Sequence, residues 1–362
     1  MSEASYNAQI VKPLSKWLRL VPSDRSFRLP LVGNEGRRVL FVQSGDITDL
    51  LFASPLLSAL NRVSAPCRVG VLVREDSSEL IRHHPYVNDM LTYQPGHMNI
   101  AHPNFFKLVR QIRKRGYDMI IHMGESPSAA HEILGYLCGA AVRIGPAHER
   151  SYPYINCELR WDPSKSGYEG RRLAEVAGLL GVTLDDNRRA AVLTDQDVRF
   201  ARQLVHFRKP RNDQILIGVD PGRSKSQTRV RTRTLAYLVN AIYQRYRSKV
   251  IVLATPEEDE AAARFEQTLQ CERIDLPRHN IKDVVALLSQ CDVFVAGNTN
   301  LMHFAVAFGV PTVSLFTERD ESRWVPPQLP HLATIRGRRG AKLSLDSFLG
   351  DVERLLSLPS GR

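Results

Sequence analysis

One stretch near the C-terminal end decides the fold: Val293-Phe-Val-Ala-Gly-Asn-Thr-Asn-Leu-Met-His-Phe-Ala-Val-Ala-Phe-Gly-Val-Pro-Thr-Val-Ser-Leu-Phe316. Its pattern predicts a buried strand at 293–296, a polar turn at 297–300, a short apolar helix at 301–308 and a second buried strand at 312–316. Two parallel strands joined by a helix make a βαβ unit. The turn after the first strand then lies at the carboxyl edge of the sheet, where the N-terminus of the helix favours an anionic ligand. This turn is therefore the first place to look for a site.

The same alternation of strand and helix patterns extends outward from this stretch in two series. The other predicted strands are 39–42, 69–73, 87–92, 119–122, 142–144, 215–219 and 250–253, and the other predicted helices are 50–61, 77–84, 105–115, 129–139, 168–180, 234–246, 257–269, 281–289 and 345–356. Continuous runs of Val, Ile and Leu separated by helices are typical of parallel sheets that are covered on both faces. We therefore predict an α/β protein of GT-B type, with two Rossmann-like doubly wound domains that face each other across a cleft.

The predicted domains follow from where each series begins and ends. They are an N-terminal extension (1–36), a first Rossmann-like domain (37–190), a second Rossmann-like domain (191–343) and a C-terminal helix (344–362) that packs back across the interdomain region. The extension mixes apolar and basic side chains, which suits an anionic membrane surface. The alternative is an extension that packs on its own domain with solvated basic residues.

Composition limits the class of protein and its partners. The 362 residues are 43% hydrophobic and 24% charged, which is typical of a soluble globular protein of about two domains. No signal peptide or membrane-spanning run is present, so we expect a cytoplasmic protein. Five widely spaced cysteines argue against a disulfide framework or a zinc site. The net charge of +11 favours a phosphate- or carboxylate-rich partner, and no motif points to nucleic acid.

Three blocks of sequence occur in an order that resembles one family. The blocks are Val39-Leu-Phe-Val-Gln-Ser-Gly-Asp-Ile-Thr-Asp-Leu-Leu-Phe-Ala-Ser-Pro55, Ile215-Leu-Ile-Gly-Val-Asp-Pro-Gly-Arg-Ser-Lys-Ser-Gln-Thr-Arg-Val-Arg231 and the stretch quoted first. Together they resemble the glycosyltransferase family 9 heptosyltransferases, which transfer heptose from ADP-heptose onto the lipopolysaccharide inner core. The resemblance implies that the first domain holds the acceptor and the second holds the nucleotide-sugar donor.

The first block implies a catalytic residue. The family carries an aspartate six positions before a proline, and counting back from Pro55 selects Asp49, with Thr48 in place of the family glycine. The family implies that this aspartate is the general base, since a carboxylate must take the proton of the attacking acceptor hydroxyl. Asp46 is the rival, because it forms the more obvious Gly-Asp pair. In either position the alternative role is a helix N-cap.

The second block implies a phosphate-binding loop after a strand. Arg223 and Ser224 match early phosphate-contacting positions of the family, while Thr228 stands where the family has lysine. Hydroxyl and cationic side chains at a strand end suit a diphosphate, although a solvated basic loop is the alternative. The missing cation would come from Arg229, Lys225 or Arg231.

The third block resembles the family pattern Asp-Thr-Gly-x-x-His. Thr299 and His303 match it, while Asn298 replaces the aspartate and Asn300 the glycine. Asn298 can still bond a sugar hydroxyl but brings no negative charge. Residues 254–258 resemble a further turn that lies near the nucleotide in the family. The predicted donor-binding residues are thus Arg223, Ser224, Lys225, Thr228, Arg229, Thr255, Asn298, Thr299, Asn300 and His303.

These resemblances imply an inverting glycosyltransferase. Its partners would be a nucleotide-diphospho-sugar donor, with ADP-heptose as the first choice, and an anionic lipid-linked saccharide acceptor at the inner face of the cytoplasmic membrane. Neither a metal ion nor a cofactor is required if loop cations and helix dipoles stabilise the leaving diphosphate. Two alternatives remain: a family member with another donor or acceptor, and a non-catalytic binding protein. The departures at Thr228 and Asn298 support the first, and those at Thr48, Thr228 and Asn298 support the second.

Overall fold

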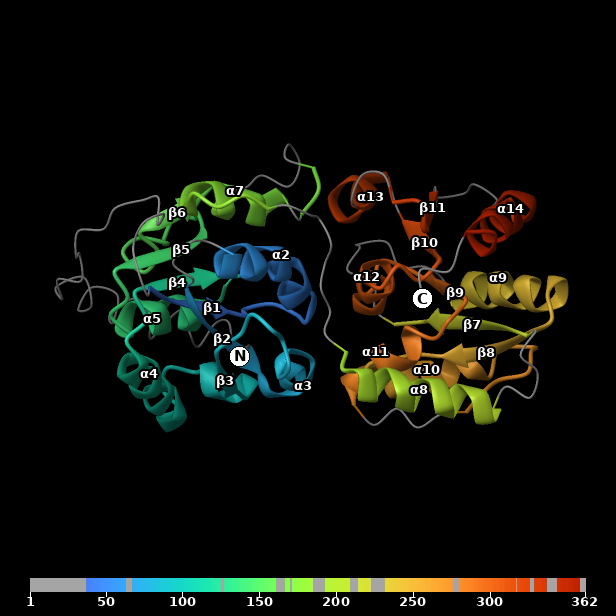
Figure 1. Cartoon of the computed structure of the whole chain (residues 1–362), viewed down its shortest axis with the longest axis horizontal. Coiled ribbons are helices and arrows are strands. Elements are labelled where there is room, and N and C mark those ends of the chain that lie inside the picture. Colours follow the sequence, from blue (N-terminus) through green and yellow to red (C-terminus); the bar gives the residue numbers. More distant parts are fainter. Residues whose placement is uncertain are drawn as a thin grey trace. The chain divides into compact units, whose positions relative to one another are not determined.

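The chain divides into two compact units in a computed structural model (Figure 1). The first unit comprises Met1–Asp162 and Gly170–Asn187, and the second comprises Pro163–Glu169 and Arg188–Arg362. The structure describes residues 37–62, 67–124, 127–160, 167–169, 171–184, 193–208, 214–222, 232–275, 280–316, 318–325, 329–336 and 344–358. The predicted N-terminal extension lies outside these residues.

The first unit is built on one parallel sheet. Its strands are β1 (Arg38–Val42), β2 (Arg68–Arg74), β3 (Asp89–Tyr93), β4 (Met119–His122), β5 (Val142–Pro146) and β6 (Cys157–Leu159). They lie in the order β3-β2-β1-β4-β5-β6, and every neighbouring pair is parallel. The order reverses between β1 and β4. In doubly wound sheets the carboxyl ends of the two strands at this reversal form the usual ligand crevice.

Helices cover both faces of this first sheet. They are α2 (Thr48–Arg62), α3 (Ser78–Ile81), α4 (Pro103–Arg115), α5 (Ala129–Leu137) and α7 (Arg171–Leu180), with short 3₁₀ turns at Glu75–Ser77 and Pro95–Met98. α2 and α7 contact each other on one face, and α4 and α5 lie on the other (Figure 1). Val39 to Val42 of β1 are fully buried, which explains why this strand reads as a continuous apolar run rather than an alternating one.

The second unit is also built on a parallel sheet. Its strands are β7 (Ile215–Asp220), β8 (Ser248–Val252), β9 (Val293–Ala296), β10 (Thr312–Phe316) and β11 (Leu332–Arg336), in the order β11-β10-β9-β7-β8. Beyond β8, Val250 makes one isolated parallel bridge to Arg273. This bridge stands where a third strand would pair with β8. If it is counted as a strand, the order of the second sheet equals that of the first, and the reversal falls between β7 and β9.

Helices also cover both faces of the second sheet. They are α8 (Asp195–Arg208), α9 (Thr232–Arg245), α10 (Asp259–Glu266), α11 (Ile281–Leu288), α12 (Asn300–Ala307), α13 (Glu318–Trp324) and α14 (Leu345–Leu356), with a 3₁₀ turn at Pro256–Glu258. α14 packs on α9, and its Phe348, Val352 and Leu355 belong to the core of this unit. Its predicted packing across the interdomain region stays a prediction.

The predicted α/β class and parallel sheets are confirmed, and four elements were not anticipated. β6 has only three residues, and β11 follows the last quoted block. α13 comes directly after that block. The sequence before residue 198 was expected to be a polar stretch, yet α8 begins at Asp195. The helix was missed because its apolar residues do not mark one face: Ala201 and Val205 are buried, while Phe200 and Phe207 are exposed. Among the described residues, no helix is long and apolar enough to cross a membrane.

Candidate functional site

The reversal in the first sheet places Asp49 in the first turn of α2, just beyond the end of β1. Asp49 is half-buried, and its Oδ2 accepts a hydrogen bond from the backbone N–H of Gly45 at 2.9 Å. The rival Asp46 accepts from the backbone N–H of Thr48 at 2.9 Å and from the Thr48 hydroxyl. Asp46 is thus held by the residue at the start of the helix, as a capping side chain is. Asp49 is held by the loop that leaves β1.

Glycine backbone closes around the Asp49 carboxylate from two strands. A Cβ atom at Gly45 would lie 2.7 Å from Asp49 Oδ2. Gly124 follows β4, and a Cβ atom there would clash with Ser44 Oγ and lie 3.1 Å from Asp49 Oδ2. Side chains at either position would displace the carboxylate or its loop. The carboxyl ends of β1 and β4 therefore meet at Asp49, as expected for a ligand crevice in this topology.

A buried arginine holds the loop that carries Gly124. Arg172 of α7 is only 2% exposed. Its Nη1 donates to the Gly124 carbonyl at 2.9 Å, and its Nη2 donates to the Met123 carbonyl. A guanidinium bonded to two successive carbonyls fixes their direction, so Arg172 sets how closely this loop approaches Asp49. No sequence pattern pointed to Arg172, because an arginine in an amphipathic helix is usually solvated.

Two further buried side chains, Tyr93 and His131, hold the backbone at the end of β1. Tyr93 donates its hydroxyl hydrogen to the carbonyl of Gln43 at 2.9 Å, and His131 Nε2 lies 3.1 Å from the same hydroxyl oxygen. Burial lowers the pKa of His131 to about 4, so this histidine is neutral near pH 7. The backbone just before Ser44 is therefore fixed by uncharged, buried groups.

The reversal in the second sheet gathers a different set of side chains. Asp220 ends β7, is buried, and accepts from the backbone N–H of Gly222 at 2.7 Å and from the hydroxyl of Thr299. The Oγ1 of Thr299 also accepts from the N–H of Met302 at 3.3 Å and so caps α12. Burial raises the pKa of Asp220 to about 7. The negative charge of Glu258 contributes to this rise, whereas the hydrogen bonds from Thr299 and Gly222 oppose it.

Thr255 and Glu258 lie beside the same turn. Thr255 Oγ1 donates to Glu258 Oε2 at 3.1 Å. A Cβ atom at Gly222 would lie 2.5 Å from Glu258 Oε2 and 2.7 Å from Asp220 Oδ1. The structure therefore places the predicted Thr255 and Thr299 at the same turn, where each bonds a carboxylate: Thr255 bonds Glu258, and Thr299 bonds Asp220. The sequence analysis did not single out these two carboxylates. The clue in the sequence was an acidic residue at the end of a fully apolar strand.

Asn298 and His303 are both fully buried and bond each other. His303 Nε2 lies 3.1 Å from Asn298 Oδ1, and the His303 ring lies 5.5 Å from that of Trp324. These polar atoms meet inside the unit, so the predicted contacts of Asn298 with a sugar and of His303 with a phosphate stay predictions. Asn300 begins α12, and its buried Oδ1 has no hydrogen-bond partner in the part of the chain that the structure describes.

The remaining predicted donor-binding residues lie outside the described residues. They are Arg223, Ser224, Lys225, Thr228 and Arg229. The described part of the chain ends at Gly222 on one side of this loop and resumes at Thr232, where α9 begins. Within the described ranges, no group of three or more His, Cys, Asp or Glu side chains is placed to hold a metal ion. The predicted independence from metal stays a prediction.

Known proteins resemble the chain in sequence and in structure. Lipopolysaccharide heptosyltransferase 3 of Escherichia coli is 21% identical over 287 residues, which cover 77% of this chain and 83% of that protein. A glycosyl transferase family 9 structure from Veillonella parvula DSM 2008 has a TM-score of 0.77 at 16% identity, over 92% of this chain and 99% of that chain. E. coli ADP-heptose lipopolysaccharide heptosyltransferase II has a TM-score of 0.68 at 17% identity, over 88% and 98%.

These comparisons confirm the predicted fold class of two Rossmann-like units of GT-B type, while the cleft between facing domains stays a prediction. They also confirm the predicted resemblance. The first block, which holds Asp49, lies before the part that the family description matches. The sequence model of Glycosyltransferase family 9 (heptosyltransferase) matches residues 105–343, more than half of the 362 residues, and the chain therefore belongs to that family.

Proposed function

We propose that the chain is an inverting glycosyltransferase that moves heptose from ADP-heptose onto a lipopolysaccharide core or a related phosphorylated saccharide. Membership of the family supports glycosyl transfer. The choice of heptose rests on two of the similar proteins, which are named as a lipopolysaccharide heptosyltransferase and an ADP-heptose lipopolysaccharide heptosyltransferase. The observation that carries the proposal is the half-buried Asp49 at the reversal of the first sheet, between two glycines.

Asp49 acts as the general base in this proposal. The acceptor hydroxyl oxygen forms a bond to the anomeric carbon of the donor, and the bond from that carbon to the diphosphate oxygen breaks with inversion. The hydroxyl proton goes to the Asp49 carboxylate, and the diphosphate leaves with the electron pair. The bond from Gly45 N–H orients the carboxylate, which is what a base must have before the substrate arrives.

The second unit holds the donor in this proposal. The N-terminus of α12 offers a partial positive charge next to Asn298, Thr299 and Asn300. The Oδ1 of Asn300, which accepts no hydrogen bond from the described residues, suits a hydroxyl donor of the nucleotide sugar. Arg223, Lys225 and Arg229 supply cations to the diphosphate, so the leaving group is stabilised without a metal ion or cofactor. Asp220 and Glu258 shape the turn that leads into this loop.

The acceptor is an anionic, lipid-linked saccharide held by the first unit. We place the protein in the cytoplasm, at the inner face of the cytoplasmic membrane, where such acceptors are presented. The net charge of +11 favours this partner, because it attracts both the phosphorylated saccharide and the anionic membrane surface.

The internal pairing of Asn298 with His303 favours a second candidate, in which the chain binds a nucleotide or saccharide without transferring it. A different donor sugar is the milder version of this alternative. Calorimetric titration with ADP, UDP and GDP, followed by turnover assays with a panel of nucleotide sugars, separates the three cases. We expect ADP to bind and ADP-heptose to turn over. Binding with turnover of another sugar changes the donor, and binding without any turnover supports a non-catalytic binding protein.

A further inference from the structure

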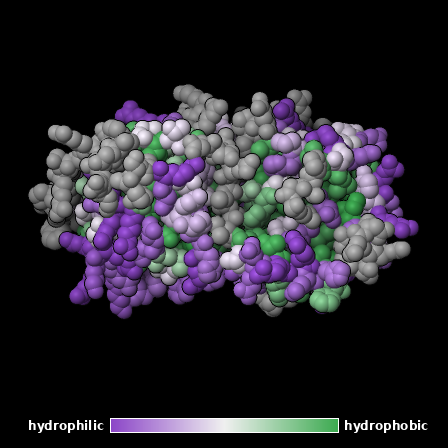
Figure 2. Space-filling view, viewed as in Figure 1, coloured by the Kyte–Doolittle hydropathy of each residue, from purple (hydrophilic) through white to green (hydrophobic). Residues whose placement is uncertain are grey.

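The outer face of α4 carries an aromatic side chain and a row of cations. Phe106 is 53% exposed, and Lys107, Arg110, Arg113 and Lys114 are exposed on the same helix. We call these five residues the α4 surface. The helix contains no acidic residue, while its opposite side packs Phe105, Leu108, Val109 and Ile112 into the unit. Hydrophilic residues gather in Figure 2 over the region where Figure 1 places α4.

The charge of this surface is not compensated within the described part of the chain. Arg115, at the end of α4, pairs with Asp89 at 2.6 Å. No carboxylate in the described ranges forms an ion pair with Lys107, Arg110, Arg113 or Lys114. Cations in the last turn complement the helix dipole, which accounts for Arg113 and Lys114. That explanation does not reach Lys107 and Arg110, which lie earlier in the helix.

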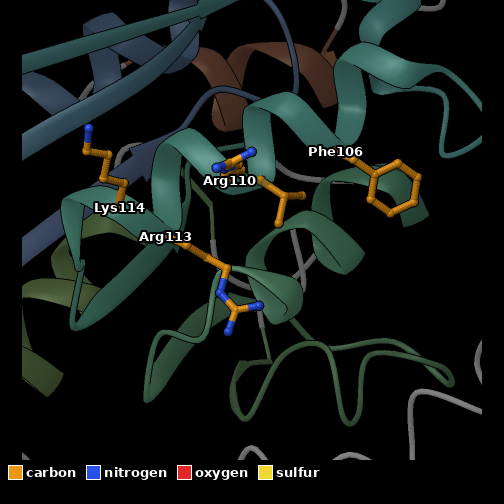
Figure 3. Close-up of a pocket in the computed structure, with 5 residues that line it drawn as sticks. Phe106, Arg110, Arg113 and Lys114 are labelled. Carbon is orange, nitrogen blue, oxygen red and sulfur yellow. The ribbon is translucent and has the colours of Figure 1, made fainter.

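The side chains of the α4 surface also form a groove. A groove of about 620 Å³ is lined by Phe106, Val109, Arg110, Arg113 and Lys114. Figure 3 shows that the four labelled side chains leave one helix, with Phe106 at one end and Lys114 at the other. Eight residues of helix separate these two ends, which is about 12 Å along the axis. A headgroup phosphate in the groove would therefore meet cations next to an apolar ring.

The groove does not lie at the reacting carboxylate. Nη1 of Arg38 donates to the carbonyl of Arg115, and Arg115 pairs with Asp89. Arg38 and Asp89 begin β1 and β3, so the basic end of α4 lies at the amino edge of the sheet. Asp49 lies beyond the carboxyl end of β1. α4 also lies on the face of the sheet opposite to α2, the helix that carries Asp49 (Figure 1), so the α4 surface is not where the acceptor hydroxyl reacts.

We propose that α4 docks the first unit on a bilayer that contains anionic phospholipid. The helix lies in the plane of the interface, Phe106 enters the boundary between headgroups and acyl chains, and the four cations contact headgroup phosphates. Exposed basic residues together with an exposed aromatic ring are the features of interfacial helices. The inference gives a location to the membrane contact in the proposed function, and it rests on α4 alone and not on transfer activity.

Vesicle co-sedimentation of the full chain tests this proposal. The probe is a set of phosphatidylcholine vesicles with and without phosphatidylglycerol. We expect binding only to vesicles with phosphatidylglycerol, and weaker binding as salt is added. Arg110→Glu with Arg113→Glu should weaken binding on the order of 100-fold, since each cation near an anionic surface contributes several-fold and both are reversed. Phe106→Ser should weaken it about fivefold, because the ring is only half-exposed to begin with.

The control is the same charge reversal on another exposed basic helix. Arg199→Glu with Arg202→Glu on α8 changes the net charge equally, and both residues are exposed. Binding close to that of the wild type supports a local surface on α4. Equal loss of binding in both double variants would overturn the proposal, because net charge alone would then explain vesicle binding. No loss of binding with Phe106→Ser would also overturn it, because the surface would then be a site for free anions. Thermal unfolding and ADP titration show that each variant is folded. Turnover of a water-soluble acceptor is measured in a separate assay, so that a loss of vesicle binding is distinguished from a loss of transfer activity.

Discussion

The two sheets share one topology but use the reversal of strand order differently. In the first unit the ends of β1 and β4 surround a half-buried carboxylate, Asp49, with glycine backbone. In the second unit the ends of β7 and β9 surround side chains that are buried and bonded in two pairs, Asp220 with Thr299 and Asn298 with His303. The same edge thus presents a partly exposed carboxylate in one unit and buried polar pairs in the other. Glycine packs against a carboxylate at both edges, so the difference comes from the polar side chains that the second edge buries.

The largest expected effect concerns the carboxylate of the first edge. Asp49→Asn removes the base but keeps an oxygen that can accept from Gly45 N–H, so kcat should fall about 10²- to 10⁴-fold while ADP binds unchanged. Steady-state kinetics and calorimetry measure the two quantities. Asp46→Asn is the matched control, and it should cost little because its oxygen can still accept from Thr48. A larger loss in Asp46→Asn than in Asp49→Asn would transfer the role of base to Asp46.

The second prediction concerns Gly124, whose backbone packs against Asp49 at the same edge of the first sheet. Gly124→Ala places a methyl group against Ser44 Oγ and Asp49 Oδ2, and a shift of the base by a fraction of an ångström to an ångström should lower kcat about 100-fold. Gly178→Ala in α7 is the control, because a methyl group there would have nothing within 4 Å. That control should keep full activity. Unchanged kinetics in Gly124→Ala would show that the approach of the β4 loop to Asp49 is not required.

The third prediction tests whether the buried pair of the second edge is structural. Asn298→Ala leaves His303 without its 3.1 Å partner and should lower the free energy of unfolding by about 2 kcal/mol, measured by urea denaturation. Asn298→Asp keeps the accepting oxygen and is the matched comparison. If Asn298→Ala has wild-type stability but no longer binds the nucleotide, Asn298 contacts the donor and the contrast between the edges disappears.

The smallest expected effect, taken per pH unit, is a change in the pH dependence of stability. Burial raises the pKa of Asp220 to about 7, so between about pH 4 and 7 the folded chain keeps a proton that the unfolded chain has lost. Stability therefore falls as pH rises through this window, by about 1 kcal/mol per pH unit, and levels off above it. Asp220→Asn should remove this slope in denaturation curves taken at several pH values.

An exposed carboxylate provides the reference for that experiment. Asp195→Asn, at the start of α8, changes the same side chain on the surface and should leave the slope as in the wild type. A slope that persists in Asp220→Asn would mean that a group other than Asp220 takes up the proton.

Local pattern was enough for the elements whose burial is continuous or periodic. The strands at 293–296 and 312–316 and the helix at 345–356 were predicted with the bounds that the structure has. Continuous apolar runs and a 3.6-residue period are properties of neighbouring residues, so they can be read without the fold. The same reasoning missed α8, where exposed phenylalanines obscure the period, and β6, where three residues are too few to show one.

The chemistry of the edges depends on residues that the chain brings together from far apart. Counting from Pro55 pointed to Asp49, but the approach of Gly124 and its fixation by Arg172 come from segments that follow much later in the chain. Likewise the motif pointed to Asn298 and His303, and the folded chain buries them against each other. Composition, periodicity and motif spacing are properties of the sequence itself, so they can be determined without the fold. The environment of a carboxylate is set by which backbone packs against it, and that follows from the strand order of the folded sheet.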